Sequence, residues 1–196
     1  CLLSGGASVR ADVLGFALSS GGRTAFFPLD VHTYMRPITA LLHDESRTKV
    51  VHDLKATLLA FHRIGVTVAG PYLDTMVADY LLNPNRRDHS LATIAMEAIG
   101  HRLGGSRPET KAPQSLFDED TVSRDEAVEQ AAGLAQLEPV MIERLTTQGS
   151  LKLFREIEMP LVPVLAEIER NGFLLDVAGL KVLSKELEHE LDKMME

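Results

Sequence analysis

The order of the predicted elements indicates an α/β fold, in which a mixed sheet is flanked by helices and followed by a helical segment. Strand-like runs come first and then alternate with helical patterns up to about residue 100. After Ser123 only helical patterns remain. Apolar residues recur in periodic blocks throughout, which excludes disorder for most of the chain, and there is no internal repeat.

The predicted sheet begins with a hairpin. Residues 9–18 and 24–29 are apolar runs typical of strands, and the Ser-Ser-Gly-Gly sequence at 19–22 is typical of the turn between them. The β-branched stretches at 48–51 and 66–68 predict two further short strands.

Capping residues mark where the next helices begin. Pro37 suits the first turn of a short helix. Asp53, Asp74 and Ser90 each precede a helical pattern and are expected to cap it, and Gly65 would end the helix that follows Asp53. The apolar face predicted for that helix contains Leu54, Leu58, Phe61 and Ile64.

The second half of the chain is predicted to be helical after a long loop at 101–117. Ser123 starts a capping box that opens a helix, which Pro139 should kink or break. An apolar pattern at 151–170 carries two prolines, and Asp176 should cap a final charged helix. The apolar stripe of this last helix contains Leu180, Leu183, Leu187 and Leu191.

Composition limits the classes of protein that the sequence fits. The 196 residues carry 20 basic and 28 acidic side chains, a net charge of −8, which argues against a non-specific nucleic-acid binder but not against a metal-dependent nuclease. No apolar run approaches the ~20 residues that a membrane span needs. The chain has one cysteine and no secretory signal, so we expect a cytoplasmic protein. Because it lacks a starting Met and stops within a helical pattern, we expect a piece of a longer chain.

A search for chemical motifs gives no Walker loop, no Gly-x-Gly-x-x-Gly and no zinc motif. The pairs His52-Asp53 and Asp74-Thr75 could be metal ligands, but helix capping explains the aspartates more simply. A loop of basic residues could contact a phosphate backbone, although a solvated loop explains it better. The residues of this possible DNA contact are Arg86, Arg87, Arg102, Arg107 and Lys111.

Two blocks resemble bacterial DNA polymerase I, a family A polymerase. The stretch FREIEMPLVPVLAEIERNG at 154–172, with the charged helix after it, is similar to the family's junction between the 3′–5′ exonuclease domain and the polymerase domain. Residues 51–55, 65–66 and 73–84 resemble the middle of that exonuclease domain.

The resemblance implies a ribonuclease-H-like fold, with an exonuclease-like domain at 1–150 and the first helices of a polymerase domain at 151–196. It implies a parent DNA-directed DNA polymerase, a nucleotidyltransferase of DNA replication and repair that uses Mg²⁺. The expected partners are the rest of the polymerase chain and primer-template DNA, with no membrane. The parent is expected to be a monomer in the bacterial cytoplasm, associated with the nucleoid.

The resemblance also implies that the exonuclease site is degenerate. Active relatives hold two metals with carboxylates from three motifs. Leu2 falls near the Glu of the first motif, Asp53 to Thr57 match the second with Thr57 at its Asp, and Gln130 and Leu134 match the Tyr and Asp of the third. This implies that the chain has no catalytic residue, no metal site and no cofactor, and that the domain is a structural scaffold.

Two other functions remain open at this stage. The chain could be part of an active metal-dependent exonuclease whose ligands lie outside it or in an altered register. It could also be a binding module in which the basic loop at 84–111 guides a DNA strand.

Overall fold

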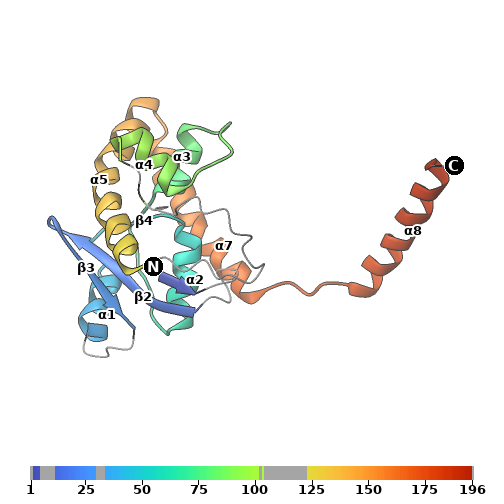
Figure 1. Cartoon of the computed structure of the whole chain (residues 1–196), viewed down its shortest axis with the longest axis horizontal. Coiled ribbons are helices and arrows are strands. Elements are labelled where there is room, and N and C mark those ends of the chain that lie inside the picture. Colours follow the sequence, from blue (N-terminus) through green and yellow to red (C-terminus); the bar gives the residue numbers. More distant parts are fainter. Residues whose placement is uncertain (1, 5–11, 30–33, 102, 104–122, 196) are drawn as a thin grey trace, which may run out of the picture.

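The computed structural model describes residues 2–4, 12–29, 34–101, 103 and 123–195. Sheet and helices form one body, and the last helix, α8, projects away from it at the end of an extended linker (Figure 1). The loop predicted at 101–117 lies outside the described residues, except for His101 and Leu103.

The predicted hairpin is confirmed. Strands β2 (Asp12–Ser20) and β3 (Arg23–Pro28) pair antiparallel, and β1 (Leu2–Ser4) pairs with the other edge of β2. Gly21 and Gly22 form the turn with φ of 58° and 75°, the left-handed conformation that a tight two-residue hairpin requires.

The second sheet is a parallel pair of β4 (Lys49–Val51) and β5 (Tyr72–Asp74). The strand expected at 48–51 is confirmed, whereas the strand expected at 66–68 is wrong, because the chain pairs with β4 a few residues later. Val66 and Val68 are buried all the same, in a cluster with Ile38 and Leu42. Apolar β-branched residues therefore predicted burial here but not backbone pairing.

Helices account for most of the remaining structure, and each expected cap is confirmed. Asp53, Asp74, Ser90 and Ser123 each accept a backbone N–H at the start of a helix. The helices are α1 (Met35–His43), α2 (Leu54–Arg63), α3 (Thr75–Leu82), α4 (Leu91–Ile99), α5 (Arg124–Gln148), α6 (Leu151–Leu153), the π-helical turn η2 (Phe154–Glu158), α7 (Met159–Asn171) and α8 (Val177–Met195).

Pro139 does not break the helix in which it lies, so the break that the sequence suggested there is wrong. Helix α5 runs through it, and Leu137, Met141 and Leu145 on either side are fully buried. Burial of these side chains offsets the hydrogen bond that Pro139 cannot donate. Pro160 is the second residue of α7 and follows directly on the π-helical turn η2, so the chain is already helical before it.

A buried carboxylate fixes the starts of α2 and α3, and we call this arrangement the Asp74 clamp. Asp74 is 1% exposed at the end of β5. One oxygen, Oδ1, accepts the N–H of Asp53 (3.1 Å) and of Met76 (2.9 Å), and Oδ2 accepts the N–H of Leu54 (2.7 Å). One side chain therefore satisfies backbone donors of two helices that follow neighbouring parallel strands.

The segment after α5 packs into the same core as the elements before it. Phe154 is 1% exposed, and Met159 and Val162 are also buried, in one cluster with Leu54 of α2. The Lys55 Nζ to Glu169 Oε2 distance of 2.6 Å adds an ion pair between α2 and α7. In contrast, α8 leaves its predicted stripe exposed, although Asp176 caps it as expected by accepting the N–H of Gly179.

The Asp74 clamp predicts that Asp74→Asn lowers the free energy of unfolding by about 1–3 kcal/mol, because an amide cannot accept at both positions and leaves a buried N–H unpaired. Asp88→Asn is the matched control, since Asp88 also accepts a backbone N–H, from Ser90, but is exposed. It should change stability much less. Denaturant unfolding measures both, and equal effects would contradict the clamp.

The packing of η2 predicts that Phe154→Ala lowers the free energy of unfolding by about 3–5 kcal/mol, through lost burial and the cavity left behind. The neighbouring Leu153 is 41% exposed, so Leu153→Ala should cost far less. Thermal or denaturant unfolding distinguishes them. Two small and similar losses would mean that residues 151–158 are not part of this core.

Candidate functional site

The two positions of the second motif lie at the start of α2, one turn apart, and both are used locally. The Asp53 carboxylate accepts the N–H of Ala56 at 3.0 Å, and its backbone adopts a left-handed φ of 60°. The Thr57 hydroxyl donates to the Asp53 carbonyl at 2.9 Å. At the position that the resemblance assigns to a metal-binding aspartate, the chain has a neutral hydroxyl that is bonded to its own helix.

The polar residues beside Asp53 also bond to the fold. The Thr75 hydroxyl donates to the Val51 carbonyl (3.2 Å), so His52 Nδ1, 3.0 Å away, carries the hydrogen and donates to Thr75. Burial lowers the pKa of His52, which keeps the ring neutral at neutral pH. Burial raises the pKa of Asp74, against the effect of its three N–H donors. Both motif pairs that resembled metal ligands thus hold β4, α2 and α3 together.

The third-motif positions lie on α5 beside apolar groups. Gln130 and Leu134 are half-buried, and Leu134 packs against the main core. Gly133 between them is buried, and a Cβ there would lie 2.0 Å from Leu103 Cδ1. The absent side chain leaves room for Leu103, which is 2% exposed. Leu134 therefore belongs to a packed apolar surface, with no oxygen for a metal.

These residues do not fit a two-metal site. Hard divalent cations require several converging oxygen ligands, mostly carboxylates. In the part of the chain that the structure describes, no group of three or more His, Cys, Asp or Glu could hold a metal ion. The side chain of Leu2, the first-motif position on β1, lies outside the described residues.

The residues expected to contact DNA divide into three cases. Arg86 is 20% exposed and is bound on two sides, by Asp79 at 3.1 Å and by Glu97. Arg87 is exposed. The other three, Arg102, Arg107 and Lys111, lie outside the described residues.

Sequence reasoning missed the network in which Arg86 takes part. Asp79 is 2% exposed on α3 and accepts hydrogen bonds from Asn83 (2.8 Å) and Arg86, with His89 Nδ1 2.6 Å from its other oxygen. The network could have been expected from one pattern in the sequence: a helical aspartate is followed within ten residues by an amide, an arginine and a histidine. The network holds the loop between α3 and α4 in place.

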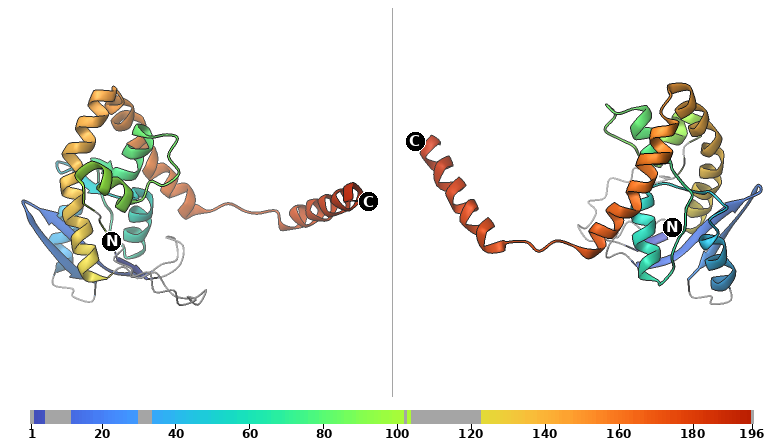
Figure 2. Two further views of the ribbon diagram at one scale, coloured as in Figure 1. Left: turned by 45° about the horizontal axis from the view of Figure 1, so that its top comes forward. Right: turned by 180° about the vertical axis from the view of Figure 1, so that it is seen from behind.

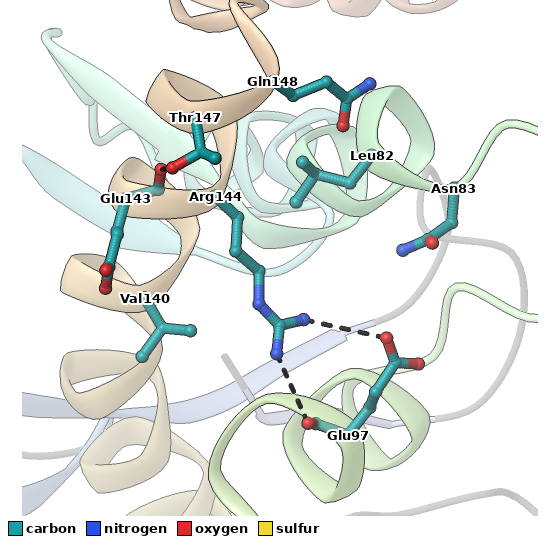
Figure 3. Close-up of a pocket in the computed structure, with 8 residues that line it drawn as sticks. All are labelled: Leu82, Asn83, Glu97, Val140, Glu143, Arg144, Thr147 and Gln148. Atoms are coloured by element: carbon teal, nitrogen blue, oxygen red, sulfur yellow. Dashed lines mark hydrogen bonds and ion pairs between the residues drawn. The ribbon is translucent and has the colours of Figure 1, made fainter.

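An open pocket of about 590 Å³ lies next to this network, between α3, α4 and α5 (Figure 3). Arg144 points across it to the Glu97 carboxylate (3.7 Å) and to the Glu97 carbonyl (3.4 Å). Gln148 donates to the Leu81 carbonyl at 3.1 Å. Arg144 and Gln148 thus bond to α4 and α3 and brace the three helices.

Among the described helices, none combines the length and the apolar character that crossing a membrane would need.

Comparison with known proteins identifies the family of this fold. The family model for the ribonuclease H-like domain of DNA polymerase I matches residues 6–103. DNA polymerase I of Bacillus subtilis is 26% identical over 94% of this chain and 21% of its own length. DNA polymerase I of Pseudomonas aeruginosa is 30% identical over 93% of this chain and 22% of its own length. The chain thus spans about a fifth of the length of the curated relatives it matches.

Solved structures share the fold at lower identity. The POL domain of Pol1 from M. smegmatis, in complex with DNA primer-template and dNTP, has a TM-score of 0.74 at 21% identity, covering 93% of this chain and 30% of that one. Brucella melitensis NrnC bound to pGG has a TM-score of 0.70 at 20% identity, covering 90% of this chain and 86% of that one. The ribonuclease-H-like α/β fold expected from the sequence is confirmed, and the chain belongs to the family of DNA polymerase I ribonuclease H-like domains.

Proposed function

We propose that this chain is the exonuclease-like part of a bacterial DNA polymerase I, that its hydrolytic site is degenerate, and that it supports the polymerase part structurally. The observation that carries the proposal concerns the two positions that the resemblance assigns to acidic ligands: Thr57 is bonded to its own helix, and Leu134 is half-buried against the core. A two-metal mechanism needs one ion to activate a water and a second to stabilise the leaving oxygen. One carboxylate at Asp53, already capping α2, cannot replace the missing set.

The activity of the parent protein follows from its relatives. We infer a DNA-directed DNA polymerase that extends a primer on template DNA and uses Mg²⁺ bound by residues outside this chain. What supports this is the match to DNA polymerase I relatives and the fold shared with a polymerase structure that contains primer-template DNA. We further propose that it acts as a monomer, in the cytoplasm and at the nucleoid.

An active exonuclease is the alternative that a specific observation favours, because a solved structure of a nuclease in its apo form shares the fold and covers most of this chain. It would require metal ligands that lie outside this chain, or an altered register of the motifs. A DNA-guiding module is the weaker alternative, since Arg86 is already bound by Asp79 and Glu97.

A degenerate site predicts that the chain does not shorten a 5′-labelled single-stranded oligonucleotide from its 3′ end with Mg²⁺ or Mn²⁺, and that titration calorimetry detects no pair of bound ions. Asp53→Asn is the informative control, since an amide oxygen can still accept the N–H of Ala56 and keep the cap. Metal-dependent shortening that Asp53→Asn abolishes would mean that Asp53 is a ligand and that the site is active. Salt-dependent DNA binding without cleavage, weakened by Arg87→Ser, would favour the guiding module.

A structural role predicts that the parent polymerase unfolds at a lower temperature once residues 1–150 are deleted. The reason is that Phe154, Met159 and Val162 would lose the core that buries them. Differential scanning calorimetry of both proteins measures the effect. An unchanged unfolding temperature would defeat the proposed role.

A further inference from the structure

We propose that the outer face of η2 and α7 is the surface through which this chain contacts the polymerase part of the same protein. The inference rests on the proposed function and names the place where the support acts. We call this face the outer stripe. Its members are large apolar side chains between 41% and 57% exposed: Ile157, Leu161, Val164, Leu165 and Ile168.

The spacing of these residues places them on one side of the helix. They recur every three or four positions, and at 100° per residue they fall within one apolar sector. The opposite side carries Met159, Val162 and Ala166, which are all buried against the body of the chain. Helix α7 is therefore apolar on two opposite faces, of which the described structure covers one.

A helix that is apolar all round is the pattern of a buried helix. Large exposed apolar patches are rare on soluble monomers and usually mark a contact surface. Two exposed charged residues, Glu156 and Glu167, border the outer stripe along one edge, as polar residues border the apolar centre of a protein interface. We infer that a second body covers the outer stripe.

The exposed apolar surface continues along the chain beyond α7 and indicates which body this is. Phe173, Leu174 and Leu175 in the linker are 84%, 103% and 65% exposed. Helix α8 follows the linker and stands apart from the body (Figure 2), and its apolar stripe is also exposed. The exposed fraction of the apolar side chains is thus larger in the linker, on the C-terminal side, than on α7. The relatives match nearly all of this chain with only about a fifth of their length, so their remaining length supplies a partner of the required size.

On this proposal α7 belongs physically to both parts. Its inner face packs against the exonuclease-like core through Val162 and the Lys55–Glu169 ion pair, and its outer face packs against the polymerase part. The domain boundary proposed at 150/151 then precedes a shared helix, and the change from one body to the other comes at 172–176.

The test uses the double variant Leu161→Ser and Leu165→Ser, made in the 196-residue chain and in the parent polymerase. Both residues are more than 40% exposed, so the short chain should unfold at nearly the same temperature with or without the changes. The parent should unfold at a clearly lower temperature, near that of the parent lacking residues 1–150. The matched control is Arg155→Ser with Glu156→Ser, two exposed residues of the same segment, which should leave both proteins unchanged.

Thiol labelling gives a direct readout of the cover. With Cys1→Ser as background, a Leu165→Cys thiol should react with maleimide on the order of tenfold more slowly in the parent than in the short chain, as expected for a site that a neighbouring body protects. Equal rates would overturn the proposal. Faster labelling of the short chain after removal of 173–196 would show that α8 covers the stripe and would also overturn it.

The failures of the two proposals are distinguishable. If deletion of 1–150 destabilises the parent but the double variant does not, the structural role stands and the outer stripe is not the contact. If neither change has an effect, the structural role itself fails. Light scattering covers the remaining occupant: a dimer of the short chain that the double variant converts to a monomer would assign the stripe to a second copy.

Discussion

The arrangement of this molecule depends on one buried carboxylate, that of Asp74. Parallel strands direct their carboxyl ends to the same edge of a sheet, so the helices that follow them begin side by side with unpaired N–H groups. Here one aspartate accepts from both helix starts, at 2.7–3.1 Å. The positive ends of the two helix dipoles favour its negative charge, while burial opposes it.

The same clamp occupies the part of the fold where chemistry is usually placed. In open α/β sheets, ligands bind beyond the carboxyl ends of the strands. In this chain the polar groups at that edge bond to one another. Asp74 accepts the helix N–H groups, and the Thr75 hydroxyl accepts a hydrogen bond from the imidazole of His52. Together with Thr57, which bonds to the Asp53 carbonyl, this makes the edge a structural joint between β4, β5, α2 and α3.

The sequence predicted elements best where a single residue determines the backbone. Asp53, Asp74, Ser90 and Ser123 cap helices because short polar side chains reach the first free N–H groups, and this requires no tertiary information. The prediction of a strand at 66–68 was wrong, because an apolar run indicates burial whether or not its backbone pairs with another strand. The break expected at Pro139 did not occur, because one lost hydrogen bond costs less free energy than the burial of Leu137 and Met141 on either side provides.

The sequence names the positions of the candidate site, but not their contacts. The resemblance assigns Thr57 and Leu134 to acidic positions of the family, and this assignment stays a prediction. That Arg86 is held by Asp79 and Glu97 depends on three elements meeting in space.

The two apolar faces of α7 follow from the same physics as the core. Burying a large aliphatic side chain stabilises the folded state by roughly 1.5–3 kcal/mol. Five such side chains in an exposed row add no such stability and lower the solubility of the protein unless another surface covers them. The inner face is satisfied by α2 and the main core, and this fixes the direction in which the outer stripe points. A helix held this way on one side presents a rigid surface to whatever binds the other. A part without a working hydrolytic site can stabilise a neighbour through such a surface, because support requires only an ordered face and a core that keeps it in place.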